Sequence, residues 1–254
     1  MKFKDMINTI QLGDCYELIK NIPDKSIDLV YIDIPYMIVN GGKGAGLLKS
    51  KARNELYEKS IGKFSNDIDY SILDDLCRVM KKIYIYIWCS KEQIYKLMKY
   101  FIEGKKCMFE ILTWCKTNPT PFCNNTFLPN IEYCLFFREV GAPRLNDGYE
   151  LKSKYYISPT NDLDKGLYRH PTIKPLELVK RHILHSTQPD DIVLDCFCGS
   201  GTTCLACKET GRRYIGMEID PKYHKIAVNR LNGILANGQT SIFTNFEQLE
   251  SEES

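Results

Sequence analysis

The sequence predicts an α/β fold in which a mostly parallel, seven-stranded sheet carries helices on both faces. Three observations predict it. Short β-favouring runs alternate with amphipathic helical patterns along the 254 residues, as in proteins built from β-α-β units. An apolar content of 44% with 26% charged residues suits a globular core. The length suits one large α/β domain or two small ones.

The expected strands are short and rich in β-branched or aromatic residues. In chain order they are Thr9–Leu12, Ile27–Ile32, Ile83–Trp88, Phe109–Trp114, Glu132–Phe137, Ile192–Asp195 and Tyr214–Glu218. Apolar residues spaced three and four apart predict the helices between them. These cover Ile72–Met80, Ile94–Ile102, Leu176–Ile183 after the helix-starting Pro175, a segment that begins at Thr202, and Asp220–Ile234.

Two long segments show neither the alternation typical of strands nor the three-to-four-residue spacing typical of helices. Residues 37–67 are rich in glycine and lysine, and residues 138–169 combine turn residues, aromatic rings and basic side chains. Loops of this length inside a compact domain are usually functional or disordered. We therefore expect a substrate to be held by these two segments.

Charge and cysteine content narrow the class of protein. The net charge of +2 implies no strong overall field, so a nucleic-acid partner would need local basic clusters. Eleven cysteines without a secretory signal favour reduced thiols and a cytoplasmic protein. No apolar run is long enough to span a membrane. The pairs Cys196/Cys198 and Cys204/Cys207 are predicted to be packing residues, with no metal site.

The strand at Ile27–Ile32 runs directly into Asp33, followed by Ile34-Pro35-Tyr36 and the glycine-rich loop. Parallel sheets bind ligands beyond the carboxyl ends of their strands, so a carboxylate there is a candidate for catalysis. Taken alone, the stretch favours a turn with a capping aspartate and a packed tyrosine.

A second stretch, from Ile192 to Asp220, reads as strand, glycine turn, helix, strand and acid. Gly199 and Gly201 allow a tight turn and close approach of a ligand. Glu218 ends the next strand, where an acid accepts hydrogen bonds from ribose hydroxyls. Position 204 is cysteine, so the full glycine pattern of dinucleotide-binding proteins is absent. The combination indicates nucleoside binding without choosing the cofactor.

Three motifs of this sequence together resemble the β group of amino-methylating DNA methyltransferases. "DCFCGSGTT" at 195–203 resembles the family signature DPFxGSGTT, "HPTIKP" at 170–175 resembles HPTxKP, and "DIPY" at 33–36 resembles the catalytic DPPY. The catalytic motif precedes the cofactor motif, as in the β group. Two positions depart from the pattern, because Cys196 and Ile34 replace proline. The resemblance covers about residues 12–235.

The resemblance implies a Rossmann-like methyltransferase fold and transfer of a methyl group from S-adenosyl-L-methionine to the amino group of adenine in DNA, after the base is flipped out. It implies one circularly permuted domain, with a catalytic half at 9–137, a short target-recognition segment at 138–169 and a cofactor half at 170–246. The catalytic residues would be Asp33, Ile34, Pro35 and Tyr36. The cofactor would contact Asp14, Thr172, Lys174, Asp195, Phe197, Gly199, Ser200, Gly201, Thr202 and Glu218.

In this reading Asp33 and the backbone carbonyl at Ile34 accept the hydrogens of the amino group, and Tyr36 stacks on the base. Isoleucine keeps that carbonyl but lacks the fixed φ of proline. DNA phosphates would meet basic residues of the two irregular segments. The predicted DNA contacts are Lys43, Lys49, Lys51, Arg53, Asn118, Arg138, Arg144, Lys152 and Lys154. Trp114 is predicted to belong to the core.

Several alternatives remain at this stage. The amino-cytosine methyltransferases more often carry serine in place of Asp33, which favours adenine. Enzymes that methylate RNA or a protein glutamine typically carry asparagine there. The same scaffold also serves nicotinamide oxidoreductases, and the altered "DIPY" suits a non-catalytic nucleic-acid-binding relative. No Pro-Cys dipeptide is present for carbon-5 cytosine chemistry. A homodimer or partner subunit and a cognate restriction endonuclease are expected partners besides DNA.

Overall fold

The computed structural model describes residues 2–36, 67–119, 127–143, 146, 148–170 and 172–240. Within them, eight strands form one sheet in the order β1-β8-β7-β2-β3-β5-β4-β6. The strands are β1 (Thr9–Leu12), β2 (Leu29–Asp33), β3 (Tyr84–Cys89), β4 (Met108–Lys116), β5 (Ile131–Arg138), β6 (Tyr155–Ser158), β7 (Ile192–Asp195) and β8 (Arg213–Glu218).

The helices of the described residues lie before, between and after these strands. They are α1 (Phe3–Met6), α2 (Cys15–Leu18), η1 (Ile19–Asn21), α4 (Ile72–Val79), α5 (Ile94–Met98), the π-helical η3 (Lys99–Gly104), η4 (Glu150–Lys152), α6 (Asp162–Tyr168), α7 (Leu176–Ser186), α8 (Thr202–Glu209) and α9 (Pro221–Leu231). None of them combines the length and the hydropathy that crossing a bilayer requires.

All seven predicted strands are confirmed, with ends that shift by two residues or fewer. The expectation of seven strands is wrong, because β6 adds an eighth at the edge. β6 lies in the segment 138–169, predicted to be irregular, and so does α6. The strand has only four residues, half of them exposed, and α6 buries none of its residues. Neither element therefore leaves a hydrophobic period in the sequence.

The strand directions bring several chain segments to one edge of the sheet. β1, β8, β7, β2 and β3 run parallel to one another, whereas β5 is antiparallel to both β3 and β4. From β2 the chain proceeds to β3 on one side, and from β7 it proceeds to β8 on the other. The strand order therefore reverses between β2 and β7, which is the position where open α/β sheets bind ligands.

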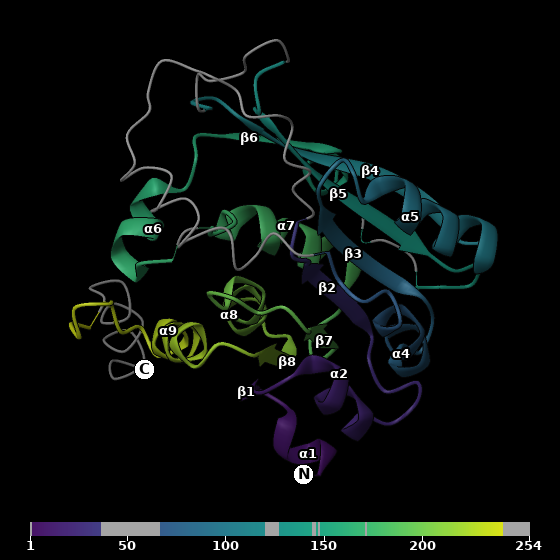
Figure 1. Cartoon of the computed structure of the whole chain (residues 1–254), viewed down its shortest axis with the longest axis horizontal. Helices are drawn as coiled ribbons and strands as arrows, with labels where there is room; N and C mark the ends of the chain where they lie inside the picture. Colours follow the sequence, from purple (N-terminus) through teal and green to yellow (C-terminus); the bar gives the residue numbers. More distant parts are fainter. Residues whose placement is uncertain are drawn as a thin grey trace.

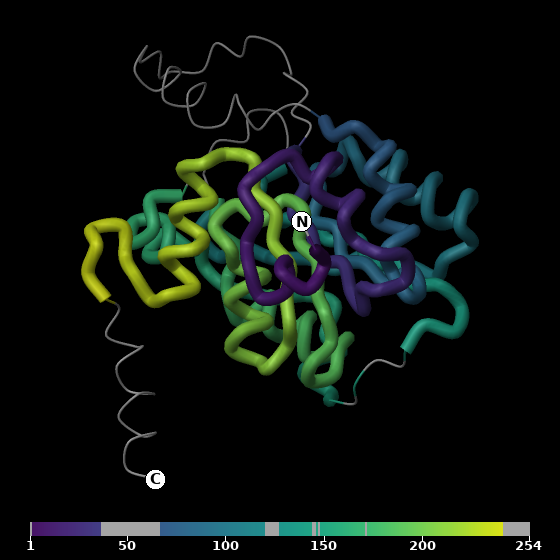
Figure 2. Tube along the Cα trace, turned by 90° about the horizontal axis from the view of Figure 1, so that it is seen from below, coloured from purple at the N-terminus to yellow at the C-terminus, as the bar shows by residue number. Residues whose placement is uncertain are grey.

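Two apolar layers enclose the sheet. One contains residues of α4 and α5, and the other contains residues of α7, α8 and α9, so helices cover both faces (Figure 1). In Figure 2 the purple N-terminal segment lies beside the yellow-green C-terminal part, since β1 pairs with β8 and contacts α9. The parallel, doubly covered architecture predicted for the chain is confirmed.

A buried polar chain crosses the α7 side of the core. The Trp88 indole N–H donates to the Tyr31 hydroxyl at 2.9 Å, and that hydroxyl lies 3.1 Å from His182 Nδ1. The His182 ring stacks on Tyr86 with centroids 5.0 Å apart. Burial lowers the pKa of His182 to about 3, so the ring is neutral in the folded protein.

We predict that His182 makes the protein less stable in mild acid. The unfolded chain protonates this histidine near its ordinary pKa of 6.5, but the folded protein does not, so stability is full above that value and falls as the pH drops toward 3. From pH 7.5 to 5.0 the loss due to His182 should be about 2 kcal/mol.

The measurement is urea unfolding of the native protein and of His182→Gln at both pH values. The variant should lose about 2 kcal/mol less than the native protein between the two pH values. His224→Gln, which changes a ring bonded to Ile10 O, is the control. Equal losses in the native protein and His182→Gln would contradict the assignment.

Candidate active site

A buried lysine lies between two acids at the carboxyl edge of the sheet. The Lys174 ammonium donates to Asp33 Oδ2 at 2.5 Å and lies 3.0 Å from Glu132 Oε2. It also donates to the Tyr36 hydroxyl at 3.1 Å, so each of its three protons has an acceptor. The ammonium lies 5.1 Å from the centroid of the Trp88 ring. The Lys174 side chain is only 9% exposed, so this position requires the neutralising carboxylates.

Charge pairing sets the proton affinities in this cluster. Burial raises the pKa of Asp33, and Lys174 opposes that rise. Burial alone would also raise the pKa of Glu132, but Lys174 and Lys116 hold it at about 2. Burial disfavours the charge on Lys174, yet the two acids raise its pKa. Glu132 and Lys174 are therefore both ionised near neutral pH.

Asp33 has one carboxylate oxygen available to a ligand. Oδ2 accepts from Lys174, whereas Oδ1 is buried and has no hydrogen-bond partner within the described part of the chain. Leaving a buried acceptor without a donor costs roughly 1–3 kcal/mol. An N–H group of a bound ligand would satisfy Oδ1 while Lys174 keeps the other oxygen in place.

The backbone after Asp33 is fixed without the proline that the motif usually carries. The Ile34 N–H donates to Trp88 O at 3.2 Å, a bond that proline could not form. The Ile34 side chain is 1% exposed, and Gln93 Nε2 donates to Pro35 O at 2.9 Å. These contacts hold the backbone at Ile34 and Pro35 in place, although Ile34 lacks the fixed φ of proline.

The turn after β7 lies close to β8 and α9. Gly199 and Gly201 have φ values of +52° and +76°, a region that favours glycine. The Gly199 N–H donates to Glu218 Oε2 at 2.7 Å, and a Cβ on Gly201 would lie 3.0 Å from that of Ala227. Glu218 Oε1 accepts from the Asp220 N–H at 2.8 Å. The end of β8 thus anchors the glycine turn.

Asp195 ends β7, next to β2. The Phe197 N–H donates to Asp195 Oδ1 at 3.0 Å. The Asp195 residue is 3% exposed, and burial raises its pKa to about 7. The negative charge of Asp33 adds to that rise, which agrees with the adjacent positions of the two strand ends. The sheet therefore brings the "DIPY" and "GSGTT" motifs together.

His170 links the "HPTIKP" segment to the same turn. Its Nδ1 accepts from the Thr172 N–H at 3.3 Å, which places the ring proton on Nε2. Nε2 is buried without a partner in the described residues and would lie 3.4 Å from a Cβ on Gly199. Burial lowers the pKa of His170 to about 4. A neutral N–H donor is thus directed at the space beside the glycine turn.

Two residues predicted to bind a cofactor, Ser200 and Thr202, have side chains that accept hydrogen bonds from Arg230. Arg230 donates to Thr202 Oγ1 at 2.7 Å and to Ser200 Oγ at 3.3 Å. It is 3% exposed and also lies 3.4 Å from Asp164 in α6. Ser200 and Thr202 can therefore offer a ligand mainly their backbone groups. Arg230 holds the start of α8 against α9 and α6.

The side chains of Lys174 and Asp14, also predicted to contact the cofactor, have protein partners as well. The Lys174 ammonium lies among Asp33, Glu132 and Tyr36, whereas the sequence placed it with the cofactor contacts. Asp14 caps α2, with Oδ1 accepting from the Tyr16 N–H at 2.9 Å. Its neighbour Gly13 donates its N–H to Glu218 O at 2.9 Å, so Asp14 still lies near the end of β8.

The predicted DNA contacts are only partly described. Five of them lie outside the described residues: Lys43, Lys49, Lys51, Arg53 and Arg144. Arg138 ends the antiparallel strand β5 and pairs with Tyr84 at the start of β3, so it lies at the opposite end of the sheet from Asp33. Burial lowers the pKa of His185, and the charge of Lys152 lowers it further. Lys152 therefore lies near the C-terminal end of α7, and Lys174 lies before the N-terminal end of that helix. The expectation that both lie beside the site is therefore wrong.

The other two predicted contacts, Asn118 and Lys154, have protein partners. Asn118 Oδ1 accepts from the Thr160 N–H at 2.6 Å, and Lys154 lies 2.5 Å from Glu110. Trp114 belongs to the core, as predicted, since it is 3% exposed. Its indole N–H donates to Ser158 Oγ at 2.9 Å, which ties β4 to β6.

The cysteines of the glycine turn pack against one another. Cys198 Sγ and Cys204 Sγ are 3.6 Å apart, and a Cβ on Gly216 would lie 2.8 Å from Cys204 Sγ. The ten cysteines of the described residues are free. In that part of the chain no three His, Cys, Asp or Glu side chains are grouped to hold a metal ion.

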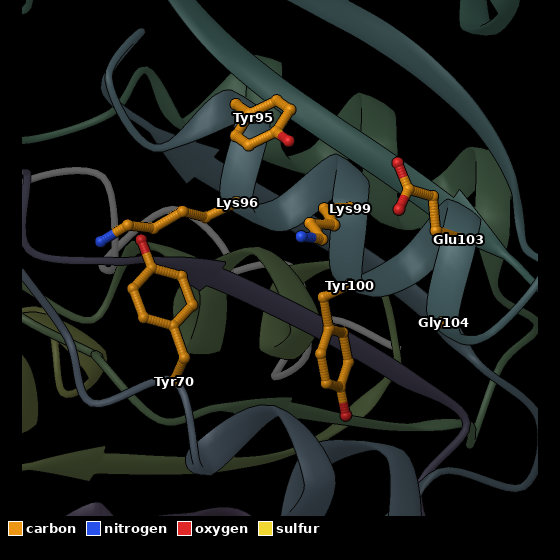
Figure 3. A pocket seen from close by; sticks show the side chains of 7 residues that line it. All are labelled: Tyr70, Tyr95, Lys96, Lys99, Tyr100, Glu103 and Gly104. Carbon is orange, nitrogen blue, oxygen red and sulfur yellow. The ribbon is translucent and has the colours of Figure 1, made fainter.

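A separate pocket of about 690 Å³ is lined by residues of α5 and η3 together with Tyr70 (Figure 3). Tyr70 and Lys96 face each other at one end of it, and both bind Asp67. The pocket contains none of the residues predicted for catalysis or cofactor binding. It is lined by Tyr70, Tyr95, Lys96, Lys99, Tyr100, Glu103 and Gly104.

Sequence reasoning missed three charged residues of the site: Glu132, Lys116 and Arg230. Glu132 stands at the start of a predicted strand, where an acid among β-favouring residues was the available signal. It reaches the site because β5 is antiparallel. Arg230 lies in the predicted last helix, but no local pattern marks it as buried. Lys116 follows a predicted strand and carries no distinguishing signal.

Known proteins resemble most of the chain. A family model for DNA methylases of the N6/N4 class matches residues 27–229. The Type II methyltransferase M2.LlaDCHI of Lactococcus lactis subsp. cremoris is 33% identical over 87% of this chain and 87% of its own length. M.HinfI of Haemophilus influenzae, also a Type II methyltransferase, is 31% identical over 92% of this chain and 70% of its own.

Two solved structures share the fold. The M1.HpyAVI–SAM complex has a TM-score of 0.61 and 24% identity, covering 87% of this chain and 98% of its own. The PvuII DNA methyltransferase, described as cytosine-N4-specific, has a TM-score of 0.63 and 18% identity, covering 91% and 93%. With the family match and the identities to the two relatives, these findings show that the chain belongs to the N6/N4 family of DNA methylases.

Proposed function

We propose that this chain transfers a methyl group from S-adenosyl-L-methionine to the N6 amino group of adenine in DNA. The observation that carries the proposal is the meeting of Asp33 and the glycine turn at the two sides of the strand-order reversal between β2 and β7. Membership of the DNA methylase family supports the reaction class and the cofactor. The aspartate at position 33 favours adenine over cytosine.

The residues of the cofactor half fit S-adenosyl-L-methionine. The groups around the turn are a backbone that glycine keeps open, the Glu218 carboxylate and the unpartnered Nε2–H of His170. Glu218 would accept from ribose hydroxyls, since each of its oxygens keeps a further lone pair. His170 would donate to an acceptor of the ligand. When bound, S-adenosyl-L-methionine supplies a methyl group on a positively charged sulfur.

Asp33 would hold and orient the target nitrogen. The lone pair of an aromatic amino group is delocalised into its ring, which makes the nitrogen a poor nucleophile. Oδ1 of Asp33 and the carbonyl of Ile34 would accept its two hydrogens and direct the lone pair outward. Tyr36 would stack on the flipped base. Positioning and electrostatics then carry catalysis, and Asp33 accepts the proton that methylation acidifies.

We further propose that the chain is one circularly permuted domain, with its catalytic half at 9–137 and its cofactor half at 170–246. The recognition segment at 138–169 is short, so a second copy or another subunit would complete the grip on DNA. The basic residues at 43–53 supply phosphate contacts in this proposal. Free thiols suit a reducing cytoplasm, and a restriction endonuclease with the same target sequence is the expected companion.

We predict that Asp33→Ala lowers the methyl-transfer rate by about 100-fold or more, because the amino group loses its charged acceptor. The dissociation constant for S-adenosyl-L-methionine should stay nearly unchanged. The assay is transfer of a radiolabelled methyl group to DNA, with binding followed by calorimetry. Asp28→Asn, at the other end of β2, is the matched control. Full activity in Asp33→Ala would refute the role of Asp33.

We predict that Glu218→Ala weakens binding of S-adenosyl-L-methionine by roughly 10-fold or more, since bonds to an ionised acceptor contribute about 1.5–3 kcal/mol. Calorimetric titration of the native protein and the variant measures this change. Glu209→Ala, an acid of α8 that pairs with Lys180, is the control. An unchanged dissociation constant in Glu218→Ala would remove the ribose assignment.

The choice of base is tested by nucleoside analysis of DNA treated with the protein and cofactor. We expect 6-methyladenine. Recovery of 4-methylcytosine would transfer the proposal to the amino-cytosine class. DNA binding without any transfer would support the non-catalytic alternative, and sequencing of the modified bases would give the recognition site.

A further inference from the structure

Glu132 is an acid of the site that none of the three motifs contains. It is the second residue of β5 and pairs with Trp114 of β4. Because β5 is antiparallel to β3, its beginning lies at the same edge as Asp33. Its side chain is 19% exposed, and both of its oxygens contact lysines. Removing a carboxylate from water is unfavourable unless close partners of opposite charge replace its hydration. Lys116 and Lys174 are these partners for Glu132.

The contacts of Glu132 form a chain that ends at Asp33. Glu132 Oε1 lies 2.6 Å from Lys116 Nζ, and Oε2 lies 3.0 Å from Lys174 Nζ. The Tyr36 hydroxyl donates to Oε2 at 3.3 Å while accepting from Lys174. The third N–H of the Lys174 ammonium donates a hydrogen bond to Asp33 Oδ2. Without Glu132, Lys174 would keep only Asp33 and Tyr36 as acceptors.

We infer that Glu132 is a positioning residue for the methyl transfer proposed above, on which this inference rests. It shares the Lys174 ammonium with Asp33, and this sharing holds the Asp33 carboxylate with Oδ2 anchored and Oδ1 directed to the target amino group. Lys116 holds Glu132 in turn, so the four charges sum to zero. The proposed role of Asp33 thereby depends on an acid from the one antiparallel strand of the described sheet.

Because Asp33 and Glu132 share the Lys174 ammonium, we predict that two variants change the pKa of Asp33 in opposite directions. Removing the charge of Glu132 leaves Lys174 to Asp33 alone and should make Asp33 a stronger acid. Removing Lys116 leaves Glu132 to compete for Lys174 and should make Asp33 a weaker acid. The ionisable groups of the described residues around Asp33 come from every adjoining element: Tyr31, Tyr36, Cys89, Lys116, Glu132, Cys134, Lys174 and Asp195.

The first experiment needs no cofactor and no DNA. The ¹³C carboxyl shift of Asp33, assigned by comparison with Asp33→Asn, is followed against pH in the native protein, Glu132→Gln and Lys116→Met. The titration midpoint should move down in Glu132→Gln and up in Lys116→Met, each by about half a pH unit or more. Glu110→Gln, which breaks the Lys154 pair on the same sheet, should leave the midpoint unchanged.

The second experiment measures single-turnover methyl transfer at saturating cofactor and DNA. Glu132→Gln should slow transfer by about 10-fold or more at pH 7.5, since small displacements of reacting groups are costly, with cofactor affinity unchanged. The acid limb of its rate profile should shift to lower pH, and that of Lys116→Met to higher pH. A merely structural role for Glu132 would lower the rate without these opposite shifts.

Three results would overturn the inference: a native rate in Glu132→Gln, no change in the Asp33 titration, or shifts of both variants in the same direction. Failure of the proposed function is distinguishable from these results. If the native protein transfers no methyl group to DNA, the proposed function fails before any variant is compared. If the native protein is active and Glu132→Gln behaves like it, only the role of Glu132 is lost.

Discussion

The ion pair between Lys174 and Asp33 joins two segments that lie 141 positions apart in the chain. Burying one ammonium ion is unfavourable by several kcal/mol unless close partners replace its hydration. Here two carboxylates, one hydroxyl and the face of Trp88 do so. This requirement fixes the relative positions of β2, β5 and the segment before α7. The geometry around Asp33 therefore follows from the need to surround the buried Lys174 ammonium with acceptors.

The core beneath the site is connected to Lys174 by further polar contacts. Trp88 lies against Lys174 on one side and donates its indole N–H to Tyr31. Tyr31 in turn contacts His182 of α7. These two hydrogen bonds allow fewer packing arrangements than an apolar contact would, because each donor must meet its acceptor. The helix that follows Lys174 is thus locked to the strands that carry Asp33 and Trp88.

Much of the fold and part of the site could be predicted. Hydrophobic period and β-branched composition located the seven strands, because most of them bury several residues, although β4 buries only Trp114. β6 and α6 escaped, since neither buries enough of its surface to leave a period. Motif spacing found Asp33, Gly199, Gly201 and Glu218. It did not reveal that the Lys174 ammonium pairs with Asp33 and Glu132, because a motif does not say which way a long side chain points. It also placed Arg138 beside the site, whereas Arg138 ends the antiparallel strand β5 at the opposite end of the sheet.

The sequence by itself determined the class of fold, the order of the motifs and the residue types available for chemistry, because these depend on local patterns. The tertiary structure alone decided which charges meet. Glu132 and Lys116 become partners of Asp33 through the reversed direction of β5, and Arg230 reaches the glycine turn through the packing of α9. Side-chain pairing over long sequence separations depends on strand order and direction, and no local pattern encodes these.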